Sequence, residues 1–255
     1  MKITFLGTGT SSGVPMIACE CDVCKSEDSR DKRLRTSVMV ETGGQTLVID
    51  SGPDFRQQML ASRVMKLDAL LFTHEHKDHV AGMDDVRAFN FRAKKPLDVY
   101  ATQHVFKCLE REFHYVFHDD GYPGVPKVNV NLIEPGTPFD ISGLEVMPFR
   151  VWHHKLPVTA FRIGDFSYVT DANAMDDEAK DVIRRSRVMV INALRKEKHI
   201  SHFTLDEAIQ LAKELEVEQT FLTHISHQLG KHAEVSVELP SNVALAFDGL
   251  EVTLT

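Results

Sequence analysis

Four residues of types that commonly bind metals lie close together in one short segment of this sequence. The segment Thr73-His74-Glu75-His76-Lys77-Asp78-His79 directly follows an apolar run at residues 69–72. We expect it to form a loop, because helical spacing would place the four side chains on different faces. Imidazole together with carboxylate suits zinc, manganese or iron(II). The candidate ligands, which could serve two neighbouring metals, are His74, His76, Asp78 and His79.

Three further candidate ligands lie far along the chain, each just after a predicted strand: His153, Asp171 and His224. Any one of them alone is more often a solvated or capping residue. Loops gather beside the ends of strands, however, and a packed fold seldom needs so many imidazoles. We therefore predict that the seven residues converge on a pair of metals. His154 is an alternative to His153 as the ligand.

Cysteines form a second cluster. Cys19, Cys21 and Cys24 lie within six residues, whereas Cys108 lies alone in a stretch of helical character. The N-terminus lacks the apolar segment of a signal peptide, so we expect a cytoplasmic protein with reduced thiols. Three clustered thiolates then indicate a zinc site rather than disulfides. The alternative is a reduced cluster without metal.

The elements that must position these residues are mostly short strands. Helical periodicity is clearest at residues 205–216, where Thr204 and Glu207 form a capping box. Strands and helices occur in both halves of the chain, which indicates two sheets packed between helices, in one domain over residues 1–255. We expect a long loop at residues 114–127, around Asp119-Asp120-Gly121. Strands are predicted at residues 3–6, 37–41, 46–50, 69–73, 98–101, 128–133, 144–151, 160–163, 167–170, 188–192, 220–223 and 251–254, and the other helices at residues 54–62, 103–113 and 176–186.

Composition limits the classes of function. The chain has 255 residues, 43% of them hydrophobic, and a formal net charge of −8. These values exclude a disordered chain and argue against an extended nucleic-acid-binding surface. No apolar run approaches the length of a membrane span, about 20 residues, so we expect no membrane partner. We expect the basic run at residues 30–35 to be a solvated face, and the following histidines to lie at the surface or in loops: His104, His114, His118, His199 and His232.

The order His-x-His-x-Asp-His, followed at a distance by His, Asp and His, resembles the metallo-β-lactamase fold superfamily. The resemblance covers nearly the whole chain. It implies an α/β (α+β) fold, a four-layer αββα sandwich with two metals at one edge. The same resemblance implies that one metal is held by His74, His76 and His153, and the other by Asp78, His79 and His224, with Asp171 bridging them and Asp50 orienting a ligand histidine.

Motifs near both ends of the chain resemble one branch, the PhnP family of phosphodiesterases of the carbon–phosphorus lyase pathway. The motifs are Cys19-x-Cys21-x-x-Cys24, the segment Thr223-His224-Ile225-Ser226-His227-Gln228, and residues 239–241 and 246–251. The resemblance implies that His227 completes a structural zinc site with the three cysteines. Such a zinc would brace the loop that carries His224.

Together these features predict a binuclear metal-dependent hydrolase that cleaves small phosphodiesters, cyclic nucleotide or ribose phosphates among them. We expect two divalent metals, manganese or zinc with iron as a further option, and attack by a hydroxide that bridges them. Asp78 counts as catalytic as well as ligating. Resemblance to the phosphodiesterase branch implies that His202 protonates the leaving group, and the alternative is a loop histidine exposed to water. The expected partners are a small phosphodiester and, as the common default, a second copy in a homodimer.

Three other functions stay open. The same metal centre could hydrolyse thioesters, lactones or β-lactams. A transfer-RNA 3′-processing endonuclease would need a basic docking surface or arm, and the sequence carries no long glycine-rich basic insertion. A zinc-stabilised interaction module without catalysis should lack ligands, whereas all seven ligand positions are filled here.

Overall fold

Two sheets form the centre of the molecule. The computed structural model describes residues 1–118 and 122–255, and within these residues each sheet has seven strands. The first sheet contains β1 (Lys2–Gly7), β2 (Ser37–Thr42), β3 (Gln45–Ile49), β4 (Ala69–Leu71), β5 (Leu97–Ala101), β6 (Val128–Leu132) and β14 (Glu251–Thr253), in the order β14-β1-β2-β3-β4-β5-β6. The second contains β7 (Phe139–Ile141), β8 (Leu144–His153), β9 (Leu156–Ile163), β10 (Phe166–Tyr168), β11 (Val188–Asn192), β12 (Gln219–Thr223) and β13 (Val243–Leu245), in the order β13-β12-β11-β10-β9-β8-β7.

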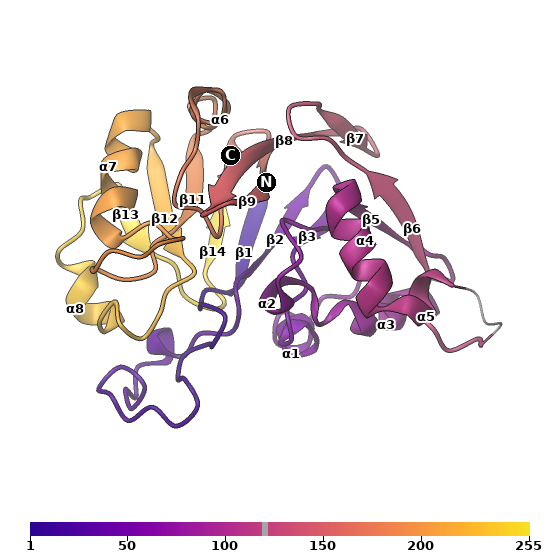
Figure 1. Cartoon of the computed structure of the whole chain (residues 1–255), viewed down its shortest axis with the longest axis horizontal. Helices are drawn as coiled ribbons and strands as arrows, with labels where there is room; N and C mark the ends of the chain where they lie inside the picture. Colours follow the sequence, from indigo (N-terminus) through magenta and orange to yellow (C-terminus); the bar gives the residue numbers. More distant parts are fainter. Residues whose placement is uncertain (119–121) are drawn as a thin grey trace.

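Helices cover the outer faces of both sheets. On the first sheet they are α1 (Phe55–Ala61), α2 (Lys77–Val80), α3 (Arg87–Ala93), α4 (Gln103–Glu112) and α5 (His114–Phe117), and beside the second α6 (Asp177–Ile183), α7 (Leu205–Leu215) and α8 (His232–Ser236). Helices α1 to α5 lie along one flank of the molecule, and α7 and α8 lie along the other (Figure 1). This arrangement is the predicted four-layer αββα sandwich, which is thereby confirmed. No helix in the described part of the chain is long and apolar enough to cross a membrane.

The sandwich is held together by apolar side chains on both faces of each sheet. Side chains alternate along a strand, so Leu47 and Ile49 of β3 face the core between the sheets, where Phe161 of β9 joins them. Val48, between them in sequence, packs instead in the core beneath the helices of the first sheet. Burying a side chain of this size stabilises the fold by about 1.5–3 kcal/mol. The spacing of apolar residues thus fixes which face of each strand meets which layer.

One edge of the sandwich gathers the ends of parallel strands. Strands β3, β4 and β5 run parallel, as do β10, β11 and β12. In open α/β sheets, ligands bind beyond the carboxyl ends of such strands. Asp50 follows β3, His74 lies three residues after β4, and His224 follows β12. The topology therefore brings residues that are distant in sequence to one place.

The structure corrects the expected loop at residues 74–79. Asp78 and His79 lie in the short helix α2, and His76 is its N-cap residue with extended backbone. The spacing excluded a continuous helix through all four ligands, but an extended segment that leads into one helical turn also brings their side chains together. The expectation of a loop was wrong for the second half of the segment.

The remaining differences concern short elements. The predicted loop at residues 114–127 contains α5, and the Asp119-Asp120-Gly121 turn lies outside the described residues. Helices α3 and α8 and strands β7 and β13 were not predicted, because elements of three to seven residues are too short to show a period. Every predicted strand is present, and Thr204 and Glu207 form the predicted capping box at the start of α7.

Candidate metal centre

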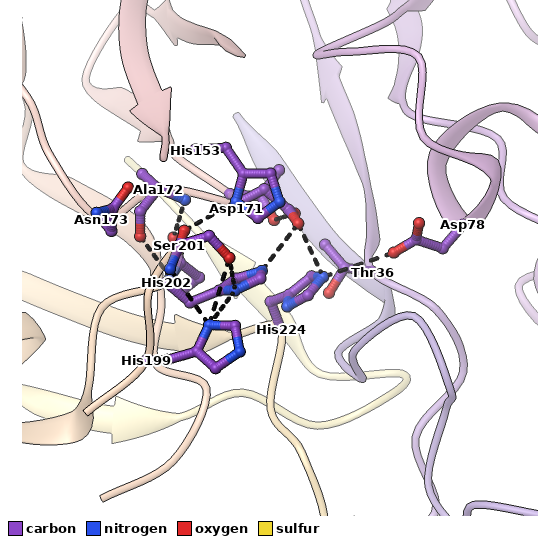
Figure 2. Close-up of polar contacts among 12 residues, drawn as sticks. Thr36, Asp78, His153, Asp171, Ala172, Asn173, His199, Ser201, His202 and His224 are labelled. Carbon is purple, nitrogen blue, oxygen red and sulfur yellow. Dashed lines mark hydrogen bonds and ion pairs between the residues drawn. The ribbon is translucent and has the colours of Figure 1, made fainter. Parts of the chain in front are cut away.

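The structure brings all seven predicted active-site ligands together. His74 and His76 lie between β4 and α2, and Asp78 and His79 lie within α2. From the other half of the chain, His153 ends β8, Asp171 follows β10 and His224 follows β12. Figure 2 shows Asp171 between His153, His202 and His224, with Asp78 approaching His224 from the other half of the molecule.

Asp171 lies at the middle of this group. Its Oδ1 is 3.2 Å from Nε2 of His224, and its Oδ2 is 3.1 Å from Nε2 of His79. Its two oxygens therefore face two different histidines of one ligand set, Oδ1 facing His224 and Oδ2 facing His79. Three sets share Asp171, and within each set the ligand atoms lie within 4.8 Å of one another: the first holds His74, His76 and Asp171, the second Asp78, His79, Asp171 and His224, and the third His153, Asp171 and His202.

His153 lies beside the first set rather than wholly inside it. The centre of its ring is 5.2 Å from that of His76 and 4.5 Å from that of His202. Its Nδ1 donates a hydrogen bond of 2.8 Å to the backbone oxygen of Ser201, which leaves Nε2 free to bind a metal. The neighbouring His154 is exposed, so the geometry favours His153 over that alternative.

Asp50 fixes the orientation of two ligand histidines from behind. Nδ1 of His79 donates to Oδ2 of Asp50 at 2.7 Å. The hydroxyl of Thr73 donates to the same carboxylate at 2.8 Å and accepts from Nδ1 of His74 at 3.0 Å. With the proton on Nδ1 in both rings, Nε2 of each is the nitrogen left to face the centre. This arrangement matches the orienting role that the family resemblance implied for Asp50.

Several buried nitrogen atoms in the group have no hydrogen-bond partner among the described residues. They are Nε2 of His74, Nε2 of His79 and both ring nitrogens of His224. Buried polar atoms are normally paired, so this group of orphans fits a bound divalent cation. The backbone also adopts the left-handed region at Asp50, Asp171 and His224, with φ of 66°, 51° and 52°. Strain of this kind collects at functional sites.

The charges of the group suit cation binding. Burial raises the pKa of Asp171, but the rings of His224 and His79 outweigh it and hold the pKa well below its usual range. Burial also lowers the pKa of His74 well below its usual value, so this ring is neutral. For His79, burial lowers the pKa, but three nearby carboxylates outweigh burial and raise it well above the usual value. The carboxylates therefore attract positive charge to this place, as a proton or as a metal.

The cysteine cluster forms a separate group with His227. Its ligand atoms, from Cys19, Cys21, Cys24 and His227, lie within 4.8 Å of one another. Nδ1 of His227 is 3.4 Å from Sγ of Cys19 and 3.3 Å from Sγ of Cys21. The backbone N–H of Cys24, followed by His227, lowers the pKa of Cys21 to about 6, so this thiol ionises readily. Thiolates and one imidazole are the donors of a closed tetrahedral zinc site.

His202 is buried rather than exposed to water, so the alternative of a solvated loop histidine is wrong. Its Nε2 lies 3.2 Å from Oδ1 of Asp171, and its Nδ1 lies 3.1 Å from Nδ1 of His199. Burial lowers the pKa of His202 to about 4, against the opposing influence of Asp171. A neutral ring with one nitrogen facing the metal centre can exchange a proton with a bound substrate.

Sequence reasoning missed residues whose burial depends on tertiary packing. The expectation of a surface or loop position was wrong for His232, which lies in α8, is buried, and donates its backbone N–H to Asp31 at 2.7 Å. His199 lies outside the helices and strands, as expected, but is half-buried against His202. Arg33, expected on a solvated face, is buried and donates to Thr8 and to the backbone oxygen of Ala246. Part of the basic run is therefore buried, and it links Thr8 to the C-terminal segment that contains Ala246. No local spacing signals this role, because Thr8 lies 25 residues away in sequence and Ala246 lies 213 residues away.

Comparisons with solved structures agree with this geometry. The crystal structure of a new diphosphatase from the PhnP family matches with a TM-score of 0.93 and 35% sequence identity, over 100% of this chain and 98% of that chain. The short form of human tRNase Z matches with a TM-score of 0.76 and 18% identity over 100% of both chains, a likeness of fold alone. The predicted resemblance to the PhnP family is thereby confirmed.

Sequence comparisons give longer relatives. A family model described as a beta-lactamase superfamily domain matches residues 45–225. An octanoyltransferase of Porphyromonas gingivalis is 39% identical over 256 residues, which cover 100% of this chain and 52% of that protein. A ribonuclease Z of Methanococcus maripaludis is 30% identical over 169 residues, which cover 63% of this chain and 48% of that protein. The chain thus spans about half the length of the curated relatives that it matches.

Proposed function

This chain belongs to the beta-lactamase superfamily, and from that premise we propose that it is a metal-dependent phosphodiesterase acting on small phosphodiesters such as cyclic nucleotides or cyclic ribose phosphates. The observation that carries the proposal is the position of His202. Its Nε2 lies 3.2 Å from Asp171, the carboxylate that all three ligand sets share. A proton donor at this distance from the centre serves a reaction whose leaving group is an alkoxide.

The residues fit two divalent cations, which we propose to be manganese or zinc, with iron(II) as a further option. His74, His76 and His153 would hold one, Asp78, His79 and His224 the other, and Asp171 would lie between them. When bound, two such cations supply a hydroxide of lowered pKa and neutralise negative charge on phosphate oxygens. Asp78, with its pKa held below the usual range by His79 and His224 against burial, stays ionised throughout.

The chain's own residues then hold and move protons. His202 carries a proton on Nε2 when an anionic phosphate lies against it, because negative charge favours the imidazolium form. It passes that proton to the departing oxygen. Its Nδ1 is within 3.1 Å of both Ser201 Oγ and His199 Nδ1, which hold the ring in place. Asp50 keeps His79 and, through Thr73, His74 in the tautomers described above.

We propose a structural zinc at Cys19, Cys21, Cys24 and His227. His224 and His227 share one short segment, and Gly9 pairs with Ile225 between them. Zinc at the cysteines would therefore anchor the segment that presents His224 to the metal centre. The proposed role of this zinc is structural, and it needs no contact between the zinc and the substrate.

A transfer-RNA 3′-processing endonuclease is the second candidate, and the ribonuclease Z relative favours it. Among the solved structures, the PhnP-family diphosphatase is 35% identical to this chain and the short tRNase Z is 18% identical, each over 100% of this chain. The net charge of −8 also disfavours docking of a large polyanion. We therefore place the small phosphodiester first. The octanoyltransferase named above is about twice as long as this chain, and its activity is not carried over.

The experiment is a substrate profile of protein reconstituted with manganese or zinc, with metal content measured on the same sample. The panel holds bis-p-nitrophenyl phosphate, a 2′,3′-cyclic nucleotide, a nucleoside diphosphate ester, lactoylglutathione and a precursor transfer RNA. We expect turnover of the small phosphodiesters, its loss with a chelator and its return with metal. Hydrolysis of the thioester without any phosphodiester would overturn the proposal, and faster cleavage of the transfer RNA would favour the second candidate.

A further inference from the structure

A further group of metal-binding side chains lies outside both sites described above. We call Glu75, His104 and Cys108 the α4 cluster, since His104 and Cys108 both lie on α4. One ligand atom from each of the three lies within 4.8 Å of the others. Oε1 of Glu75 is 3.0 Å from Nε2 of His104. Residues four apart on a helix share a face, so His104 and Cys108 point to the same side.

The distances in the α4 cluster suit a small cation. Ligand atoms on a tetrahedral zinc lie about 3.3–3.6 Å apart, given bond lengths of about 2.0–2.3 Å. The side chain of His104 is 64% exposed, so it can shift to close the remaining gap at little cost. One thiol, one imidazole and one carboxylate are donors that Zn²⁺ accepts. The three leave a fourth tetrahedral position for water.

Glu75 supplies an independent observation. Its Oε2 is buried and has no hydrogen-bond partner among the described residues, although Oε1 is paired with His104. Buried carboxylate oxygens are normally paired, so this oxygen is available to a ligand. Glu75 lies between His74 and His76 in sequence, yet its side chain contacts α4 while theirs contact each other. The α4 cluster is therefore separate from the metal centre but joined to it by one residue of backbone.

We propose that the α4 cluster binds a further divalent cation of the zinc type, held by Glu75, His104 and Cys108 with one open position. A cation there ties the segment that carries His74 and His76 to α4. The proposal does not depend on the phosphodiesterase activity. It adds a cation to the two of the metal centre and the one at the cysteines, at a site that opens to solvent on one side.

The test follows Cys108 in the intact protein across a series of buffered free Zn²⁺ concentrations. Cys108 is alkylated with iodoacetamide, and the modified peptide is counted by mass spectrometry, which reads this cysteine separately from the other three. Zinc at nine-tenths occupancy should slow alkylation of Cys108 about tenfold, because only the free thiolate reacts. In His104→Ala the protection should be lost, and zinc content should fall by about one per chain at the same free Zn²⁺.

Glu110→Gln is the matched control, since Glu110 is an exposed acid on α4 outside the cluster. It should keep both the protection and the zinc. No protection of Cys108 in the wild-type protein up to micromolar Zn²⁺ would overturn the proposal. Protection of Cys108 that persists in His104→Ala would also overturn it. So would a loss of zinc in Glu110→Gln as large as the loss in His104→Ala. Thermal unfolding of each variant checks that folded proteins are being compared. Both substituted residues are exposed, so we expect both variants to fold.

Discussion

Nε2 of His202 lies 3.2 Å from Oδ1 of Asp171, and the same oxygen lies 3.2 Å from Nε2 of His224. One carboxylate oxygen therefore faces both the proposed proton donor and a proposed metal ligand. Proton donation and metal binding are therefore coupled, because a shift of Asp171 changes its distance to both rings. It follows that substitutions of His202 must be checked for metal content before a catalytic role is assigned.

Replacing His202 with alanine should slow turnover according to the leaving group. For a phosphodiester with an alkoxide leaving group, we expect a loss of about 10²–10⁴-fold in kcat. For bis-p-nitrophenyl phosphate the loss should be much smaller, since p-nitrophenolate departs without a proton. Steady-state kinetics on both substrates, with metal analysis, makes the comparison. Full turnover of the alkoxide substrate by His202→Ala would remove His202 from the mechanism. His154→Ala, an exposed histidine beside His153, should behave as wild type.

Replacing Asp50 with asparagine should weaken metal binding rather than unfold the chain. Asp50 orients His79 directly and His74 through Thr73, and loss of such outer partners typically costs 10- to 100-fold in metal affinity, roughly. Competition with a chromogenic chelator measures the affinity. Asp68→Asn is the control. Asp68 accepts a hydrogen bond from the backbone N–H of Thr46, which lies near the start of β3, whereas Asp50 follows the end of β3. An unchanged affinity in Asp50→Asn would contradict the orienting role.

Replacing Cys19 with serine should remove zinc and lower the melting temperature. The loop that carries Cys19 is joined to His227 through the cysteine cluster, so loss of one thiolate frees both segments. At limiting free Zn²⁺ we expect about one zinc fewer per chain, with the loss read by mass spectrometry of metals. Glu20→Gln changes an exposed neighbour and should leave both quantities unchanged. If Cys19→Ser kept its zinc and its melting temperature, the structural site would be disproved.

Stability should depend on pH through Asp248. Burial raises the pKa of Asp248 to about 6, against opposing hydrogen bonds from Leu34 and Thr8. The folded state then binds the proton more tightly than the unfolded chain, so this contribution is full below about pH 4 and is lost as the pH rises through about 6. Its upper limit is about 3 kcal/mol.

The measurement is denaturant unfolding of the wild type and Asp248→Asn at several pH values between about 4 and 7. Contributions from other groups cancel in the difference between the two proteins. The stability of the wild type relative to Asp248→Asn should fall as the pH rises. A difference that stays constant, or grows, would contradict the assigned pKa of Asp248.

The sequence revealed the candidate site more fully than the packing around it. The ligand types recur at short spacings, as from His74 to His79, and each distant ligand follows a predicted strand that is visible as a short apolar run rich in β-forming residues. Strand-end position is informative because the sheet edge is a place where loops converge. The spacing did not reveal which ligands would share one metal. His153, for example, lies between His76 and His202 in space.

Contacts set by tertiary packing were beyond local patterns. Arg33 looked like part of a solvated basic run, yet it is buried against Thr8 and Ala246, and its guanidinium lies 3.2 Å from Nδ1 of His232. Only the fold decides that these groups meet. Helix α2 was missed for a different reason, because four residues form barely one turn and leave no period to detect.

The pairing of β1 with β14 has a consequence for biosynthesis. Lys2 faces Thr253, and the N-terminal amine donates to the backbone oxygen of Leu254, so β1 cannot pair on this side until β14, about 250 residues later, has been synthesised. A nascent chain leaving the ribosome can pair β1 with β2, but its other edge stays open until residues 251–253 emerge. The first sheet is therefore completed only after residues 251–253 have been synthesised, and until then the free edge of β1 is open to pairing with other strands.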